Sequence, residues 1–160
     1  MAKRTITAAF MSIFLVFGVE AEMVSFLVVE TGLPQEGERK QHSEHWEDSL
    51  LDVFFEAGHI VSNSPVLRLD SKPSGEIINA VTADMDEAKE GGADYFIIAQ
   101  LDYAPGSQTP DEISLVLFRI VPYKKIYEKQ ITGKKYKSAK EETDDLKKIA
   151  RGLVPHLNAQ

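Results

Sequence analysis

Two histidines three residues apart, His42 and His45, are the residues of this sequence whose types and spacing most invite a chemical role. Residues three apart lie on one face of a helix, so both imidazoles can approach the same metal ion. Glu44 and Glu47 are close in sequence, but a metal site needs a third ligand and supporting hydrogen bonds. Acidic residues also favour the first turn of a helix, where Ser43 is a candidate N-cap. The incomplete ligand set favours the helix interpretation, and the two histidines stay as candidate metal ligands.

A second motif, the glycine pair in the stretch EGGADYF, has the composition of a phosphate-binding loop. Such a loop follows a strand and precedes a helix, whose amino-terminal N–H groups point at the phosphate. Gly91 and Gly92 instead follow a predicted helix and precede a predicted strand, so the helix presents its negative carboxyl end. We therefore predict that the pair ends the helix, with one glycine in the left-handed conformation.

The remaining polar residues do not form a recognisable catalytic set. The carboxylates in 84–90 are expected on the solvated face of a helix, and Asp102 ends a strand, where aspartate commonly serves a turn. No serine lies in a nucleophile-elbow pattern, and the sequence has no cysteine. We expect no catalytic residue and no cofactor. Ligands of α/β sheets favour the carboxyl ends of strands, which makes Glu30, Thr31 and Gly32 a candidate groove.

The composition is that of an acidic globular protein, with 160 residues and a net charge of −7. This charge argues against nucleic acid as a partner. Basic residues precede the apolar run Ile6–Val19, and small residues follow it, as in a signal peptide cleaved between Ala21 and Glu22. The run is shorter than the roughly 20 residues that span a bilayer. We expect a periplasmic protein with no stable membrane insertion after cleavage, or, alternatively, an uncleaved anchor.

Apolar periodicity predicts the elements that must position these residues. The spacing of apolar residues indicates helices that end at glycines, and alternating or continuous apolar runs indicate strands. The predicted strands cover 23–31, 59–65, 93–103, 113–121 and 124–133, and the predicted helices cover 42–58, 76–90 and 138–157. We predict a single α/β domain over residues 22–160, of βαβαββα type, in which a mixed five-stranded sheet packs against helices. The loops 32–41 and 66–75 are candidate recognition loops or plain connections.

The order of elements and three short stretches resemble one superfamily of bacterial envelope proteins. These stretches are LLDVFFEAGHIV, GADYFIIAQLDY and LVLFRIVPYKKIYEKQITG. The superfamily includes the amino-terminal domain of TolB, the secretion protein CsgG and the lipoprotein activators of penicillin-binding proteins, and its sheet is of the anticodon-binding-domain-like kind. The resemblance implies an exported, non-catalytic domain that binds other envelope proteins. Without cysteine the chain cannot be lipidated as those lipoproteins are, and it is too short to include TolB's β-propeller.

Three functions follow as hypotheses. The first is a non-catalytic binding or adaptor domain of the cell envelope that acts through protein–protein interaction. The second is a small secreted metal-dependent enzyme or ligand-binding protein that uses His42 and His45. The third is a structural or secretion-associated subunit that forms homo-oligomers through the strand 124–133, which its lysines mark as an edge strand.

Overall fold

The computed structural model describes residues 21–32 and 38–157. Residues 1–20 of the predicted signal peptide lie outside this part of the chain. Six strands, three α-helices, one short helix α4 and one 3₁₀ helix η1 make up this part of the chain. In chain order they are β1 (Met23–Thr31), α1 (Glu38–Glu56), β2 (Ile60–Asn63), β3 (Leu67–Leu69), η1 (Ile77–Ala80), α2 (Thr82–Glu90), β4 (Tyr95–Asp102), β5 (Glu112–Arg119), β6 (Lys124–Thr132), α3 (Ala139–Arg151) and α4 (Val154–Leu157).

The strands form one mixed sheet in the order β2-β1-β4-β5-β6, and β3 pairs with β1 on the same edge as β2. β1 is parallel to β2, β3 and β4, whereas β5 runs antiparallel to both of its neighbours. β1 and β4 lie at the centre and are buried along almost their whole length. This burial on both faces explains why their sequences are nearly continuous apolar runs rather than alternating ones.

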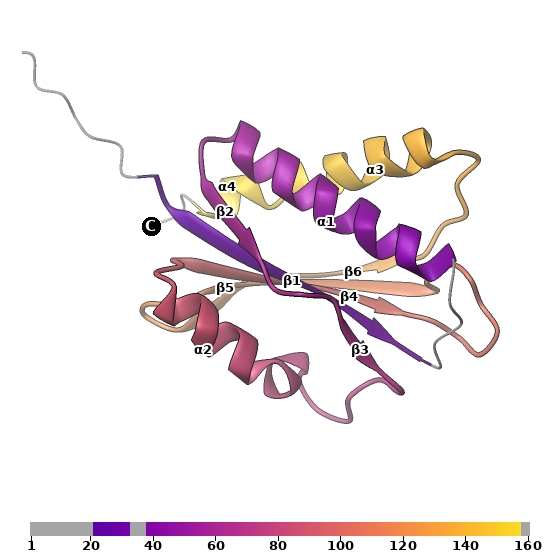
Figure 1. Ribbon diagram of the computed structural model, residues 1–160, viewed down its shortest axis with the longest axis horizontal. Helices are drawn as coiled ribbons and strands as arrows, with labels where there is room; N and C mark the ends of the chain where they lie inside the picture. The colour runs from indigo at the N-terminus through magenta and orange to yellow at the C-terminus, as the bar shows by residue number, and fades with distance from the viewer. Residues whose placement is uncertain (1–20, 33–37, 158–160) are drawn as a thin grey trace, which may run out of the picture.

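Helices cover both faces of the sheet (Figure 1). α1, α3 and α4 pack on one face, where Val24, Phe26 and Val28 of β1 meet Trp46 and Leu50 of α1 in one apolar cluster. η1 and α2 pack on the other face. A second apolar cluster forms there from the alternate strand residues and the helices: Leu27, Val29, Ile78, Val81, Ala93, Phe96, Ile98, Val116, Phe118 and Ile120. The structure is therefore a three-layer α/β sandwich, and it confirms the predicted α/β class with a mixed sheet packed against helices.

The side chains of the central strand β4 alternate between the two faces of the sheet. Every second residue from Tyr95 to Tyr103 belongs to the cluster under α1 and α3. The turn before this strand is also as predicted, because Gly92 has a φ of 90° and takes the left-handed position after α2. The amide of Ala93 then donates to the carbonyl of Ala88 and closes the helix, at 2.9 Å.

Four details differ from the sequence prediction. The segment 66–75, predicted to be a recognition loop or a plain connection, contains the short sixth strand β3. The predicted helix 76–90 is divided into η1 and α2 at Val81. The last helix is divided at Gly152 into α3 and α4. α1 begins at Glu38, before the predicted start, so Ser43 lies inside the helix and is not its N-cap. Local periodicity does not detect a strand of three residues or a single break between two helical turns.

Among the described residues, the helices are all too short or too polar to cross a membrane.

Candidate functional site

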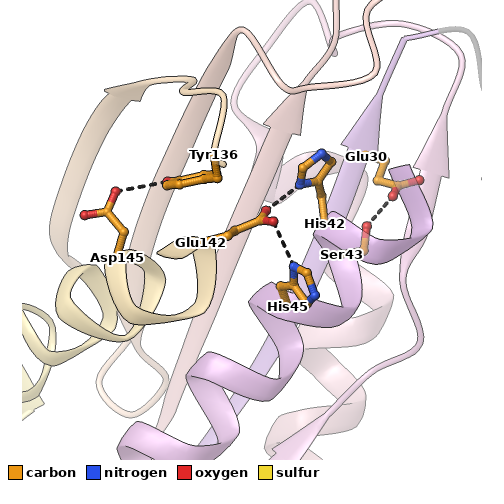
Figure 2. A network of polar contacts seen from close by, with 7 residues as sticks. All are labelled: Glu30, His42, Ser43, His45, Tyr136, Glu142 and Asp145. Atoms are coloured by element: carbon orange, nitrogen blue, oxygen red, sulfur yellow. Dashed lines mark hydrogen bonds and ion pairs between the residues drawn. The ribbon is translucent and has the colours of Figure 1, made fainter. Parts of the chain in front are cut away.

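His42 and His45 converge on a single carboxylate, that of Glu142 (Figure 2). Both histidines project from the same face of α1, and Glu142 projects towards them from the first turn of α3. The Nδ1 atom of His42 contacts Oε1 of Glu142, and the Nδ1 atom of His45 lies 2.9 Å from Oε2. The prediction that the two imidazoles share one face is therefore confirmed. Their common partner is an acidic residue one hundred positions away in the sequence.

The lowered pKa of Glu142 indicates which nitrogen of each histidine ring donates to it. Burial, the largest single influence, would raise the pKa of Glu142, but the hydrogen bonds and charges of His42 and His45 together lower it. An ionised carboxylate only accepts hydrogen bonds, so Nδ1 of each ring is the protonated nitrogen that donates to Glu142. The Nε2 atoms are the ring atoms that remain for other contacts. The carboxylate is thus a buried negative charge held between two imidazole donors.

Two parallel helices hold the cluster in place. α1 and α3 both begin at the end of the sheet where β1, β4 and β6 terminate, and they run side by side (Figure 1). Two ion pairs continue the seam between them: Lys147 with Asp52 at 2.7 Å and Arg151 with Glu56 at 3.5 Å. The polar contacts of α3 therefore recur every one to one and a half turns along its side facing α1.

The start of α3 is fixed by a side-chain cap. The Ser138 side chain accepts a hydrogen bond from the amide of Glu141, so Ser138 is the N-cap. The Glu141 carboxylate accepts the amide of Lys137 at 3.0 Å, not that of Ser138 as a standard capping box would. This cap places Glu142 at the position that faces α1.

Tyr136, in the loop before α3, lies on the other side of Glu142 from the histidines (Figure 2). Its hydroxyl donates to Asp145 at 3.0 Å, and the ammonium of Lys134 lies 4.8 Å from the ring centroid. Burial, together with the negative charge of Asp145, raises the pKa of the Tyr136 hydroxyl. The hydroxyl therefore stays protonated and acts as a hydrogen-bond donor at neutral pH.

His42, His45, Tyr136 and Glu142 line one cavity of about 560 Å³. Its walls are the start of α1, the loop 106–109 between β4 and β5, and the segment 135–139 that leads into α3. Gly133 brings two of these walls together, because a Cβ atom there would lie 1.5 Å from the carbonyl oxygen of Pro110. A volume of this size lies in the range of small-molecule sites, although its lining is mainly polar.

The candidate groove residue Glu30 lies away from this cavity. It is buried at the end of β1, where Ser43 of α1 donates to one carboxylate oxygen and Arg68 of β3 donates to the other at 2.8 Å. Figure 2 shows the Ser43 contact on the far side of α1 from Glu142. Glu30 thus connects the sheet, α1 and β3, and this explains why a serine occurs within α1 at this position.

Thr31 and Gly32 also make contacts within the fold. Thr31 is buried and donates to Asp102, which also accepts from Gln100 at 2.6 Å. Lys72 lies 2.6 Å from Asp102, and hydrogen bonds to Asp102 and Glu112 raise the pKa of Lys72. Gly32 has a φ of 102°, and a Cβ atom there would lie 2.5 Å from the Tyr103 carbonyl oxygen. The three residues of the candidate groove are therefore placed by contacts between neighbouring strands.

Glu142 is the functional candidate that sequence reasoning missed. Helical spacing places it one turn before Leu146, on the side of α3 that is buried. An acidic residue on a buried stripe signals a paired carboxylate, but it does not identify the partner. His42, His45 and Glu142 are three residues of metal-ligating types, yet no group of three or more His, Cys, Asp or Glu in residues 21–32 and 38–157 has an arrangement that could hold a metal ion.

Comparison with solved structures finds distant similarities. A variant of the PelC dodecamer from Paraburkholderia phytofirmans has 10% identity and a TM-score of 0.48, with 87% of this chain and 90% of PelC covered. TolB from Acinetobacter baumannii has 11% identity and a TM-score of 0.43, with 87% of this chain and 29% of TolB covered. The lipoprotein GNA1162 from Neisseria meningitidis has 10% identity and a TM-score of 0.45, with 84% and 99% covered.

No curated protein matches the sequence. The match to a family model covers most of the part of the chain that the structure describes. That model is described as "Uncharacterised protein" and matches residues 24–153, so the chain belongs to this family.

Proposed function

We propose that this chain is an exported, non-catalytic domain that binds other proteins of the bacterial cell envelope. The signal-like amino terminus supports export, and the resemblance to envelope domains supports the class of partner. The contacts of Glu142 support a structural role for the histidine cluster, because the acid and both imidazoles already satisfy one another. In this proposal no residue makes or breaks a bond, and the function lies on the surface of the sandwich.

The observation that carries the proposal is the placement of the exposed apolar side chains. Phe55 at the end of α1 is 72% exposed, and Val121 in the β5–β6 turn is 70% exposed. Ile60 and Tyr123 are also exposed. Exposed apolar groups that gather in one region of a protein commonly mark a surface that contacts another protein.

Hydrogen bonds place the strand ends next to these residues at the same end of the sheet. The amide of Ile60 donates to Glu22, just before β1, at 3.1 Å. The amide of Asp94 donates to Met23 and the amide of Ile120 donates to Asp94, each at 2.8 Å. The starts of β2, β1 and β4 and the end of β5 therefore lie in one row, and the apolar residues flank it on both sides.

Site-directed photo-crosslinking in the cells that produce the protein tests the proposal. A photoreactive phenylalanine analogue is introduced at Phe55, at Val121 or, as a control, at the exposed Asp86 of α2. We expect discrete adducts of higher mass with other proteins from the first two positions and none from the third. Absence of adducts from both Phe55 and Val121, or an identical pattern from Asp86, would overturn the proposal.

A second candidate function is small-ligand binding in the cavity of about 560 Å³, which its volume favours. A metal form of this function would require His42, His45 and Glu142 to leave their present contacts, because no group among the described residues is arranged to hold a metal ion. Addition of zinc or nickel chloride would then raise the unfolding temperature of the natural protein. The His42→Ala/His45→Ala variant would show no such rise. Equal responses of the two proteins, or no response and no bound metal in the purified natural protein, would remove the metal form of this function.

A further inference from the structure

β6 leaves a long backbone edge open at one side of the sheet. It is the last strand in the order and pairs with β5 over its whole length. In the described part of the chain, no strand pairs with its outer edge. At about 3.3 Å per residue, its nine residues present roughly 30 Å of edge. The opposite edge is formed by much shorter strands, β2 and β3.

This edge carries a positive charge that the rest of the chain does not have. The segment from Lys124 to Lys140 contains seven lysines and one acidic residue, Glu128, whereas the whole chain has a net charge of −7. The segment is therefore strongly cationic within an anionic protein. The lysines follow β6 and the loop into α3: Lys124, Lys125, Lys129, Lys134, Lys135, Lys137 and Lys140.

The register of β6 places lysines on both faces of the edge. Lys129 lies opposite Leu115, a residue of the cluster under α1 and α3, and Lys125 lies opposite Phe118, a residue of the α2-side cluster. Lys125 already pairs with Glu128 at 2.7 Å. Among the described residues, no acidic side chain forms an ion pair with Lys124 or Lys129, and Lys124 lies opposite Arg119.

Charge decides which occupant suits this edge. β6 contains three lysines and one glutamate, so two copies that paired with each other would bring two positively charged strands together, and like charges on neighbouring strands are destabilising. A strand with acidic side chains would instead place carboxylates next to Lys124 and Lys129. Main-chain hydrogen bonds to the open edge would supply affinity, and the charges would supply preference and faster association.

We propose that β6 accepts an acidic, extended peptide segment of a partner protein as an added strand. The inference rests on the proposed function in that the partner is another protein, and it names the binding surface and the chemistry of the segment. The surface differs from the apolar end at Phe55 and Val121, so each can be tested without the other.

The probe is a fluorescent synthetic peptide in which glutamate alternates with valine and which is long enough to span β6. We expect it to bind the purified exported protein with an affinity that falls as salt is added. Lys124→Glu/Lys129→Glu should weaken binding about tenfold or more, since both charges that lack an acidic partner are reversed. The control Lys89→Glu/Lys148→Glu makes the same change in net charge at exposed positions on α2 and α3 and should bind as the natural protein does.

Experiments that detect backbone hydrogen bonds distinguish strand addition from a general attraction between charges. On binding, hydrogen exchange should slow at the amides of β6. A peptide N-methylated at every second amide, on the side that would face β6, should bind much more weakly. Equal binding of the methylated peptide, of polyglutamate or of anionic phosphatidylglycerol vesicles would overturn the inference, as would unchanged binding by the Lys124→Glu/Lys129→Glu variant. A dimer in solution with β6 amides already protected would also overturn it.

The two proposals fail separately. If the crosslinks from Phe55 and Val121 form and the peptide does not bind at β6, only the strand-addition inference is wrong. If the peptide binds at β6 but the crosslinks are absent, the apolar end is not the surface that the proposed function requires.

Discussion

At the scale of single residues, Glu142 is a carboxylate whose role depends on two partners from another helix. Its pKa is lowered because donors from His42 and His45 outweigh the cost of burial. A buried charge of this kind stabilises the fold only while both donors are present. Replacing the Glu142 carboxylate by an amide of nearly the same shape should therefore have a clear effect on the stability of the fold.

The change Glu142→Gln keeps the shape and removes the charge, and it should lower the free energy of unfolding at neutral pH by about 2 kcal/mol. Because the folded pKa lies below the unfolded value near 4.5, the carboxylate stabilises the fold fully above that value. This stabilisation is lost as the pH falls through the folded pKa, so the difference between the two proteins should close in acid. Urea unfolding at a series of pH values measures it.

Asp144→Asn is the matched control for this comparison. Asp144 is an exposed carboxylate on the same helix and pairs with Lys140 at 2.5 Å. An exposed pair contributes about 0 to 1 kcal/mol, so the control should change stability little. A stability difference between natural protein and Glu142→Gln that stays constant down to the lowest pH would contradict the assigned charge.

Gly32 offers a second test at this scale. Gly32→Ala would place a Cβ atom 2.5 Å from the Tyr103 carbonyl oxygen, in a backbone conformation that alanine disfavours. Gly58→Ala has a similar positive φ but meets no atom within 4 Å. We expect Gly58→Ala to cost about 1–2 kcal/mol from strain alone. Gly32→Ala should cost clearly more in thermal or urea unfolding, and equal losses would contradict the close approach.

At the scale of elements, α1 is a helix with one buried face and one face that meets solvent. Trp46, Leu50 and Phe54 repeat at helical spacing and are almost fully buried against the sheet. The positions next to them, Leu51 and Phe55, are exposed although they are equally apolar. Composition alone does not separate these two sets, whereas their angular position around the helix does.

Leu50→Ala and Leu51→Ala form a matched pair that measures this difference. Leu50 has no exposed surface, so its truncation leaves a cavity and should cost about 3 kcal/mol. Leu51 is 43% exposed, and its truncation should cost less than about 1 kcal/mol. Urea unfolding of both variants gives the comparison, and similar losses would mean that α1 is rotated from the described orientation.

At the scale of the whole molecule, the central strands contribute to both apolar clusters at once. Successive residues of β4 and β5, such as Val116 and Leu117, point to opposite faces. A change under α2 must therefore affect the layer under α1 through the shared backbone of the sheet. The domain should unfold as one cooperative unit.

Val81→Ala tests this cooperativity. Val81 is fully buried in the α2-side cluster, and its truncation should cost about 1–3 kcal/mol. Trp46, the single tryptophan, lies in the opposite cluster and reports on that layer by fluorescence. The fluorescence midpoint and the far-UV circular dichroism midpoint should shift together in urea. A dichroism midpoint that moves while the Trp46 signal stays in place would mean that the two layers unfold separately.

The sequence by itself determined the fold class and most of the elements, because strand and helix periodicity are local properties of consecutive residues. The alternation from Tyr95 to Tyr103, the turn at Gly91 and Gly92 and the N-cap at Ser138 were all predictable for this reason. The pairing of His42 and His45 along one helical face followed from the same rule.

Only the tertiary structure decided which distant residues meet. Glu142 joins His42 because α1 and α3 lie side by side, and Glu30 holds Ser43 because β1 passes beneath α1. These contacts depend on the order of strands in the sheet, which no local pattern encodes. The same strand order leaves β6 at the edge, and that position makes its lysines available for a partner.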